Sequence, residues 1–282
     1  MKTGLILEGG GMRGVYTGGV LEKFLEEEIF TDYIIGVSAG ACNASSFISR
    51  QNGRNHAVTI GYVHHPDYIS MKNWFKKREL FGMDLIFDEI PNKLVPFNYD
   101  DFNEATEEFV VGTTDCLTGE AVYFEKRNEP KEVLAIVRAS SSLPFMSHPV
   151  EFEGSKLMDG GIADPIPIRK AMADGVTHPI VVLTKEKGYR KKKSSFSGVL
   201  SALYRQFPGI VKSMEKRYLL YNETMEFIEE LEAAGEVLVI RPSKTYKIGR
   251  IERNPEKLTE LYNQGYEDAE EALEKVKKFI DK

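Results

Sequence analysis

The chain has 282 residues, of which 42% are hydrophobic and 28% charged, as in an ordinary globular protein. Its formal net charge of −6 argues against nucleic-acid binding, which requires a basic surface along the phosphates. Two cysteines, Cys42 and Cys116, are too few for a disulfide framework, and no apolar run reaches the roughly 18 residues of a membrane span. The N-terminus also lacks the pattern of a signal peptide, so we expect a cytoplasmic protein.

The N-terminal part begins with the pattern of a βαβ unit. Leu5–Leu7 and Tyr33–Val37 are predicted as buried strands, separated by an amphipathic helix over Val15–Glu27. A helix of small and apolar residues follows over Ala39–Arg50. From residue 54 to 103 the pattern becomes irregular and aromatic, and we interpret this part as a cap or substrate segment.

The rest of the chain continues the α/β pattern. Further strands are predicted over Glu108–Thr114, Ala121–Glu125, Pro179–Thr184 and Val237–Arg241, with a hairpin over Val150–Met158. Helices are predicted over Lys131–Ser140, Phe227–Ala234 and Pro255–Lys282, and a loop over residues 194–198. The length fits one large domain or two small ones around a mostly parallel sheet.

The stretch EGGGMRG, Glu8–Gly14, lies between the first strand and the first helix and has two interpretations. Gly9, Gly11 and Gly14 fit the G-x-G-x-x-G spacing of a loop that binds a pyrophosphate. The same backbone N–H groups could instead stabilise an oxyanion. A dinucleotide site also needs an acidic residue at the end of the second strand. Asp32 precedes that strand and therefore belongs to the wrong edge of the sheet.

The second strand leads into GVSAG, Gly36–Gly40, which matches the G-x-S-x-G nucleophile elbow. In such a turn Ser38 stands above the C-terminal edge of the sheet, and the flanking glycines avoid crowding it. Ser38 occupies the position where a ribose-binding acid would be required. The elbow therefore favours an oxyanion hole over a pyrophosphate loop at residues 8–14.

A serine nucleophile needs a base, and the histidines are badly placed for this role. His178 begins a predicted parallel strand, at the edge opposite the elbow, while His64 and His65 lie in the irregular segment. Asp159 follows a strand and precedes Gly160–Gly161, so its carboxylate could take the proton directly. An Asp-Gly pair alone is also an ordinary turn signal, and the assignment depends on all three motifs.

These motifs resemble those of patatin-like phospholipases. Gly9–Gly14, Gly36–Gly40 and Asp159–Gly161 occur in that family's order and placement, and Arg138–Phe145 resembles its segment between the serine and the aspartate. The likeness covers residues 5–183. It implies a three-layer α/β/α sandwich with a mostly parallel central sheet. We expect a single domain over residues 1–282, in which residues 185–282 form a helical extension and a closing strand.

The resemblance implies a Ser–Asp dyad that hydrolyses acyl esters of lipids without a metal or organic cofactor. Ser38 would be the nucleophile and Asp159 its base, with a pKa raised by partial desolvation. The oxyanion hole would comprise Gly9, Gly10, Gly11, Arg13 and Ala39, supported by motif residues Gly14, Gly36, Gly40, Gly160 and Gly161. The family often has Asn where this chain has Asp164, which could alter the loop that supports Asp159.

Arg13 and the cap segment each have more than one interpretation. Arg13 could steady the glycine loop or attract a lipid phosphate, or pair with Glu22 or Glu26; we favour loop support. Residues 72–90, which are aromatic and basic, could form an acyl pocket or membrane lid, or an ordinary cap. The basic run Arg190–Lys193 could contact anionic headgroups, although such runs are usually solvated. Peripheral contact with an anionic membrane is therefore a hypothesis.

Two other functions remain open from the sequence. One is a general carboxylesterase or thioesterase with the same dyad, acting on other acyl esters. The other is a non-catalytic regulatory protein that retained the fold. The sequence carries no signal for an oligomeric state.

Overall fold

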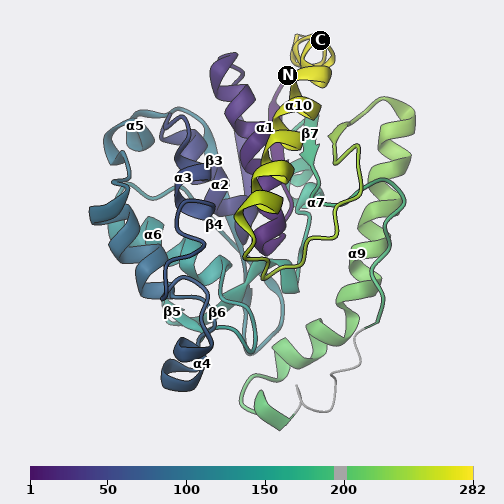
Figure 1. Ribbon diagram of the computed structural model, residues 1–282. Helices are drawn as coiled ribbons and strands as arrows, with labels where there is room; N and C mark the ends of the chain where they lie inside the picture. The colour runs from purple at the N-terminus through teal and green to yellow at the C-terminus, as the bar shows by residue number, and fades with distance from the viewer. Residues whose placement is uncertain (194–201, 282) are drawn as a thin grey trace.

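An eight-stranded sheet forms the centre of the computed structural model, which describes residues 1–193 and 202–281 (Figure 1). The strand order is β5-β6-β3-β2-β1-β7-β8, and β4 also pairs with β3. The strands are β1 (Thr3–Leu7), β2 (Tyr33–Val37), β3 (Glu108–Asp115), β4 (Ala121–Glu125), β5 (Val150–Phe152), β6 (Ser155–Asp159), β7 (His178–Val182) and β8 (Leu238–Ile240). The loop predicted over residues 194–198 lies outside the described residues.

The strands at the middle of the sheet are parallel and end at one edge. β1 pairs in parallel with β2 and β7, β2 with β3, and β7 with β8, whereas β4, β5 and β6 pair antiparallel. Leu7 lies opposite Gly36 on one side and Val182 on the other. The segments that follow β1 and β2 therefore emerge side by side at the C-terminal edge.

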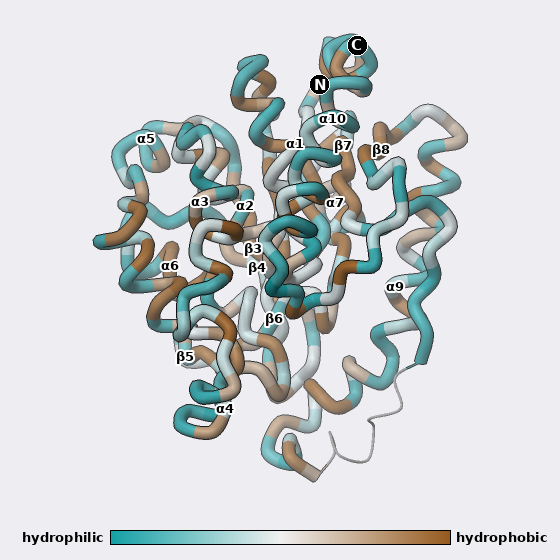
Figure 2. The backbone as a smooth tube through the Cα atoms, viewed as in Figure 1, coloured by the Kyte–Doolittle hydropathy of each residue, from teal (hydrophilic) through white to brown (hydrophobic). Residues whose placement is uncertain are grey.

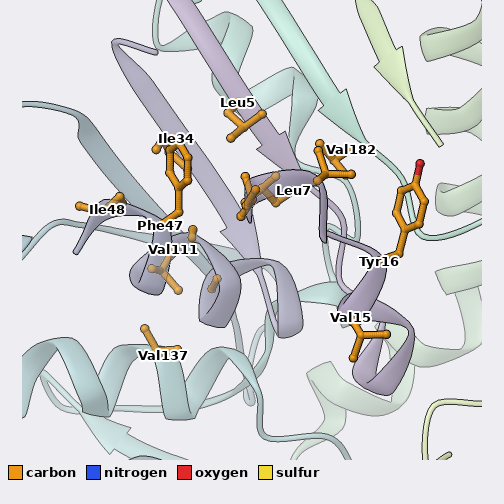
Figure 3. Close-up of a cluster of buried hydrophobic side chains, with 14 of the residues drawn as sticks. Leu5, Leu7, Val15, Tyr16, Ile34, Phe47, Ile48, Val111, Val137 and Val182 are labelled. Carbon is orange, nitrogen blue, oxygen red and sulfur yellow. The ribbon is translucent and has the colours of Figure 1, made fainter. Parts of the chain in front are cut away.

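Helices cover both faces of the sheet. One layer contains α1 (Val15–Glu26), α2 (Ala39–Ile48), α6 (Pro130–Ser140) and α10 (Pro255–Ile280), and the other contains α7 (Ile168–Ala173) and α9 (Pro208–Ala234). Alternate residues of β1 point to opposite layers, since Leu5 and Leu7 join the first core and Ile6 the second. Figure 3 shows the first core between strands and helices. The predicted three-layer α/β/α sandwich is confirmed.

The C-terminal region belongs to the same sheet and core as the motifs. β8 extends the sheet beside β7, and α10 packs along α1. A Cβ added to Gly19 would meet the Tyr262 carbonyl, and one added to Gly265 would meet that of Tyr16. The two helices cross this closely because glycine lies on both sides. Figure 2 shows that hydrophilic residues cover much of the outside of α10.

The helix predicted over Phe227–Ala234 begins much earlier, at Pro208, so the predicted boundary is wrong. The first half of α9 uses polar contacts: Ser213 Oγ donates to the Gly119 carbonyl, and Arg217 Nε donates to that of Gly161. The recurrence of apolar residues at helical spacing cannot reveal a helix whose buried face is partly polar.

The segment from 54 to 103 is less irregular than predicted. It contains α3 (Arg54–Thr59), α4 (Met71–Lys77), the π-helical η2 (Leu85–Leu94) and α5 (Tyr99–Glu104). The α-helices among these have at most seven residues, which is too short for a helical period to stand out. Two 3-10 turns, η1 (Gly11–Gly14) and η3 (Gly160–Ile162), lie at the predicted motifs.

Within the part of the chain that the structure describes, no helix has the length and apolar character needed to cross a bilayer.

Candidate active site

Ser38 occupies a strained turn between β2 and α2. Its φ of 54° and ψ of −126° are unusual for a residue with a side chain. A Cβ on Gly36 would lie 2.7 Å from the Ala41 nitrogen, and one on Gly40 would lie 2.5 Å from the Leu7 carbonyl oxygen. Glycine is therefore required at both positions, as the elbow motif predicts. Gly14 packs against the same turn, since a Cβ added to it would lie 2.5 Å from that of Ala39.

A buried serine holds the backbone of this turn. The Ser38 N–H donates to Ser140 Oγ at 2.8 Å, and the Ser140 hydroxyl donates to the Gly112 carbonyl at 2.6 Å. Ser140 belongs to the serine-rich end of α6, which resembles the family's segment. The sequence indicated that segment, but it did not reveal this contact.

Asp159 lies at the end of β6, where strand register brings it to Ser38. Val37 pairs with Gly112 of β3, and the next residue of β3, Thr113, pairs with Asp159. Ser38, which follows Val37, and Asp159 therefore lie on the two sides of β3, at neighbouring positions along it. Both are buried, with 6% and 1% of their surfaces exposed.

The environment of Asp159 suits a base. Its Oδ1 accepts a hydrogen bond from the Gly161 N–H at 2.8 Å, while its buried Oδ2 meets no donor with hydrogen-bond geometry among the described residues. Burial raises the pKa of Asp159, while the charge of Arg217 and the nearness of the Ser38 hydroxyl oppose this increase. The expected upward shift of the Asp159 pKa is thus found.

The turn after Asp159 requires small residues. Gly160 packs on the Gly112 carbonyl, and a Cβ on Gly161 would lie 3.0 Å from Asp159 Oδ1. Asp164, the departure from the family pattern, accepts a hydrogen bond from the Tyr123 hydroxyl at 2.6 Å. Its carboxylate therefore faces Tyr123.

The glycine loop lies beside Ser38. The Gly9 N–H donates to the Pro165 carbonyl at 3.4 Å, and Gly10 packs against Thr184. Gly11 has a φ of 58°, and Arg250 holds the loop through its carbonyl, which accepts from the Met12 N–H at 3.1 Å.

An apolar pocket of about 110 Å³ contains Ser38. Gly11 and Ala39 reach it from the glycine loop and from the first turn of α2, where helix N–H groups have no intrahelical acceptor. The apolar part of its lining includes Met12, Val15, Val58, Tyr68, Phe81, Met83, Ile86, Phe87 and Leu143. The cap segment thus supplies much of this wall. No histidine of the described residues lines it.

Arg13 points away from this apolar pocket. Its side chain lines a second cavity of about 470 Å³, together with Glu8, Lys191, Arg217 and Arg250; we call this cavity the basic pocket. The alternative pairing of Arg13 with Glu22 or Glu26 is wrong. The Glu22 carboxylate accepts from the Gly53 N–H at 2.7 Å, and that of Glu26 accepts from the Tyr266 hydroxyl.

The basic run is not an ordinary solvated loop. The Arg190 guanidinium pairs with Glu229, and the Lys191 backbone N–H donates to Asn222 Oδ1 at 2.7 Å. Asn222 in turn donates to the Lys191 carbonyl at 3.1 Å, so the run is attached to α9. Lys192 and Lys193 remain exposed.

Two protein-family models match parts of this chain. A family model described as patatin-like phospholipase matches residues 5–172. The chain belongs to this family. Membership supports hydrolysis of lipid esters at the level of the family. A second model, for a domain of unknown function (DUF6363), matches residues 207–281, which contain Arg217 and Arg250.

The individual relatives of this patatin-like protein have modest sequence identity to it. The uncharacterized protein YjjU of Escherichia coli is 30% identical over 65% of this chain and 52% of its own length. A lysophospholipase nte1 of Aspergillus terreus is 26% identical over 98% of this chain and 18% of its own. The chain thus spans about half the first relative and about a fifth of the second. The crystal structure of VipD from Legionella pneumophila aligns with 97% of this chain and 67% of its own, at a TM-score of 0.49 and 13% identity.

Proposed function

We propose that this protein is a serine acyl hydrolase of phospholipase A type, which cleaves carboxylic esters of lipids. The observation that carries the proposal is the strained turn that presents Ser38, next to the buried Asp159, to an apolar pocket. Lysophospholipases among the relatives support a lipid substrate.

In the proposed reaction, Ser38 Oγ attacks the ester carbonyl while Asp159 accepts the hydroxyl proton. The raised pKa of Asp159 makes its carboxylate a better base than an exposed aspartate. Asp159 then gives the proton to the departing alcohol, leaving an acyl group on Ser38. A water molecule, deprotonated by Asp159, releases the acid and restores the enzyme.

The developing oxyanion needs hydrogen-bond donors. We assign this role to backbone N–H groups of Gly10, Gly11 and Ala39, each worth about 3 kcal/mol in the transition state. The Gly9 N–H already has the Pro165 carbonyl as acceptor. The Arg13 side chain does not suit a donor role at the oxyanion, because it lines the basic pocket and not the apolar pocket.

The decisive experiment compares fluorophosphonate labelling and lysophospholipid hydrolysis across variants. We expect Ser38→Ala to abolish labelling, and Asp159→Asn to lower kcat by about 10³-fold or more, as in other dyads and triads. Asp164→Asn is the matched control: it makes the same change on a carboxylate that faces Tyr123, and should keep most activity. Full activity of Asp159→Asn would rule out the dyad.

The same assays separate the two other functions. Hydrolysis of short p-nitrophenyl esters or thioesters, with none of lysophospholipids, would indicate a general esterase or thioesterase. A folded wild-type protein that neither reacts with the probe nor hydrolyses any ester would indicate a non-catalytic role.

We also propose peripheral contact with anionic membranes through α4. Met71 and Phe75, one helical turn apart, are 58% and 73% exposed, and Lys72 and Lys76 lie between and beside them. The adjoining residues Phe81 and Met83 line the apolar pocket. This position would bring the pocket close to a bilayer surface. Flotation with anionic vesicles tests the contact.

A further inference from the structure

The glycine loop borders two pockets of opposite character. Gly11 and Met12 line the apolar pocket, whereas Glu8 and Arg13 line the basic pocket. Six cationic side chains line the basic pocket without an ion pair to a described carboxylate: Arg13, Lys185, Lys191, Lys192, Arg217 and Arg250.

One carboxylate, that of Glu8, lines this pocket, and its oxygens already have partners. Glu8 Oε2 accepts from the Thr184 N–H at 2.6 Å and from its hydroxyl at 2.9 Å, and Oε1 accepts from the Tyr221 hydroxyl at 3.0 Å. A single carboxylate cannot balance the charge of these six basic side chains. The positive charge of the pocket is therefore largely uncompensated.

The cations are held in place by the fold. Lys191 is fixed through its backbone to Asn222, and its ammonium lies 4.0 Å from the centre of the Tyr221 ring. The Arg13 Nε is buried and has no hydrogen-bond partner among the described residues. Burying such groups is unfavourable unless a counter-charge completes the site.

Burial and, to a smaller extent, mutual repulsion disfavour the charged forms of these side chains. Burial, followed by the charges of Arg217 and Arg250, lowers the pKa of Lys191 to about 6. Burial also lowers the pKa of Arg13 and of Lys185. Lys191 is therefore largely uncharged at neutral pH when no counter-ion is near, and a bound anion would restore its charge.

We propose that the basic pocket binds a phosphate group, either on the lipid whose ester lies at Ser38 or free in solution. Several guanidinium and ammonium groups around one cavity suit the charge and the many oxygens of a phosphate. The lipid-borne form rests on the hydrolase function proposed above, whereas binding of free phosphate does not.

The connection between the pockets supports a lipid source. Arg217 lines the basic pocket, donates to the Gly161 carbonyl and acts on Asp159 through its charge. Arg250 lines the same pocket and holds the glycine loop through its carbonyl. A lipid with its ester at Ser38 and its acyl chain in the apolar pocket would have the basic pocket beside its headgroup.

The first test measures binding without turnover. Inorganic phosphate and glycerol 3-phosphate are titrated calorimetrically into the full-length Ser38→Ala protein at low ionic strength. We expect binding that weakens at least tenfold on adding Lys191→Gln or Arg250→Gln. Lys187→Gln removes an exposed charge outside the pocket and should bind as before. Thermal melting checks that each variant is folded.

The second test identifies the source of the phosphate. The kcat/KM for 1-palmitoyl-lysophosphatidate is divided by that for 1-palmitoylglycerol, which has the same ester without a phosphate. A lipid-borne phosphate predicts that Lys191→Gln lowers this ratio at least tenfold and Lys187→Gln does not. An unchanged ratio together with phosphate binding would assign the pocket to free phosphate and overturn the lipid-borne form.

The two proposals fail in different ways. Absence of phosphate binding to folded Ser38→Ala protein, or equal weakening by Lys187→Gln, would overturn the phosphate site even if esters are hydrolysed. Phosphate binding with no ester hydrolysis by the wild type would overturn the hydrolase and leave the phosphate site standing.

Discussion

At the scale of single residues, the pKa of Asp159 depends on its burial and on two cations, Arg217 and Arg250, from the distant C-terminal region. Burial raises its pKa above the ordinary 3.8, and Arg217 is the strongest influence in the other direction, with Arg250 also lowering the pKa. The proposed base works only when ionised. Activity should therefore fall as the pH is lowered through the pKa of Asp159.

Arg217→Gln should move this acid limb to higher pH, because it removes the charge that favours the carboxylate. The measurement is kcat/KM against pH on a neutral ester such as 1-palmitoylglycerol, which reports the pKa of the free enzyme. Lys216→Gln, a change of the same charge at an exposed neighbour, is the control. An acid limb that stays in place in Arg217→Gln would contradict the coupling.

The sequence predicts the proposed dyad but not the cations around it. Ser38 and Asp159 lie in short motifs whose glycines have local steric reasons that are visible in the sequence. Arg217 reaches Asp159 across more than fifty positions of the chain, from a helix whose polar contacts hide its period. Nothing near Arg217 or Arg250 in the sequence distinguishes them from surface arginines.

At the scale of elements, α4 differs from the rest of the cap segment. The structure buries none of its residues, whereas Met83, Leu85 and Phe87 further along are buried. The sequence could not separate a membrane lid from an ordinary cap, since both are rich in aromatic and basic residues. Burial divides the segment into a wall of the apolar pocket and an exposed helix.

Phe75→Ser should reduce flotation with anionic vesicles several-fold, because an inserted phenylalanine buries its apolar surface in the bilayer interface. Leu219→Ser, on the exposed side of α9, removes another exposed apolar side chain and should have little effect. Equal flotation of wild type and Phe75→Ser would show that α4 is not the contact.

At the scale of the whole molecule, strand register brings the motifs together. The sequence predicts that the segments after β1 and β2 meet at one edge, because both strands are parallel. Asp159 ends an antiparallel strand, which by direction alone would carry it away from that edge. It reaches Ser38 because β6 overlaps only the last three residues of β3, Thr113–Asp115. The sequence does not show that the overlap between β3 and β6 is so short.

The close crossing of α1 and α10 should make the stability of the fold sensitive to the glycines at the crossing. We expect Gly265→Ala to lower the free energy of unfolding by about 1–3 kcal/mol, since the new methyl group would overlap the Tyr16 carbonyl. Urea unfolding measures this. Gly249→Ala is the matched control, because a Cβ there would meet no atom within 4 Å. Equal stability of the two variants would contradict the close crossing.

Because the Arg250 carbonyl holds the glycine loop, the order of synthesis on the ribosome determines when the loop can form. Ser38 and Asp159 leave the ribosome well before Arg250, whose carbonyl holds the loop at Met12. The stretch from Asp159 to Arg250 takes roughly 5 to 18 s to translate at about 5–20 residues per second. During that interval the nascent chain carries the proposed nucleophile and base without the loop's support. The proposed hydrolase would thus become active only after Arg250 has been synthesised and has reached the loop.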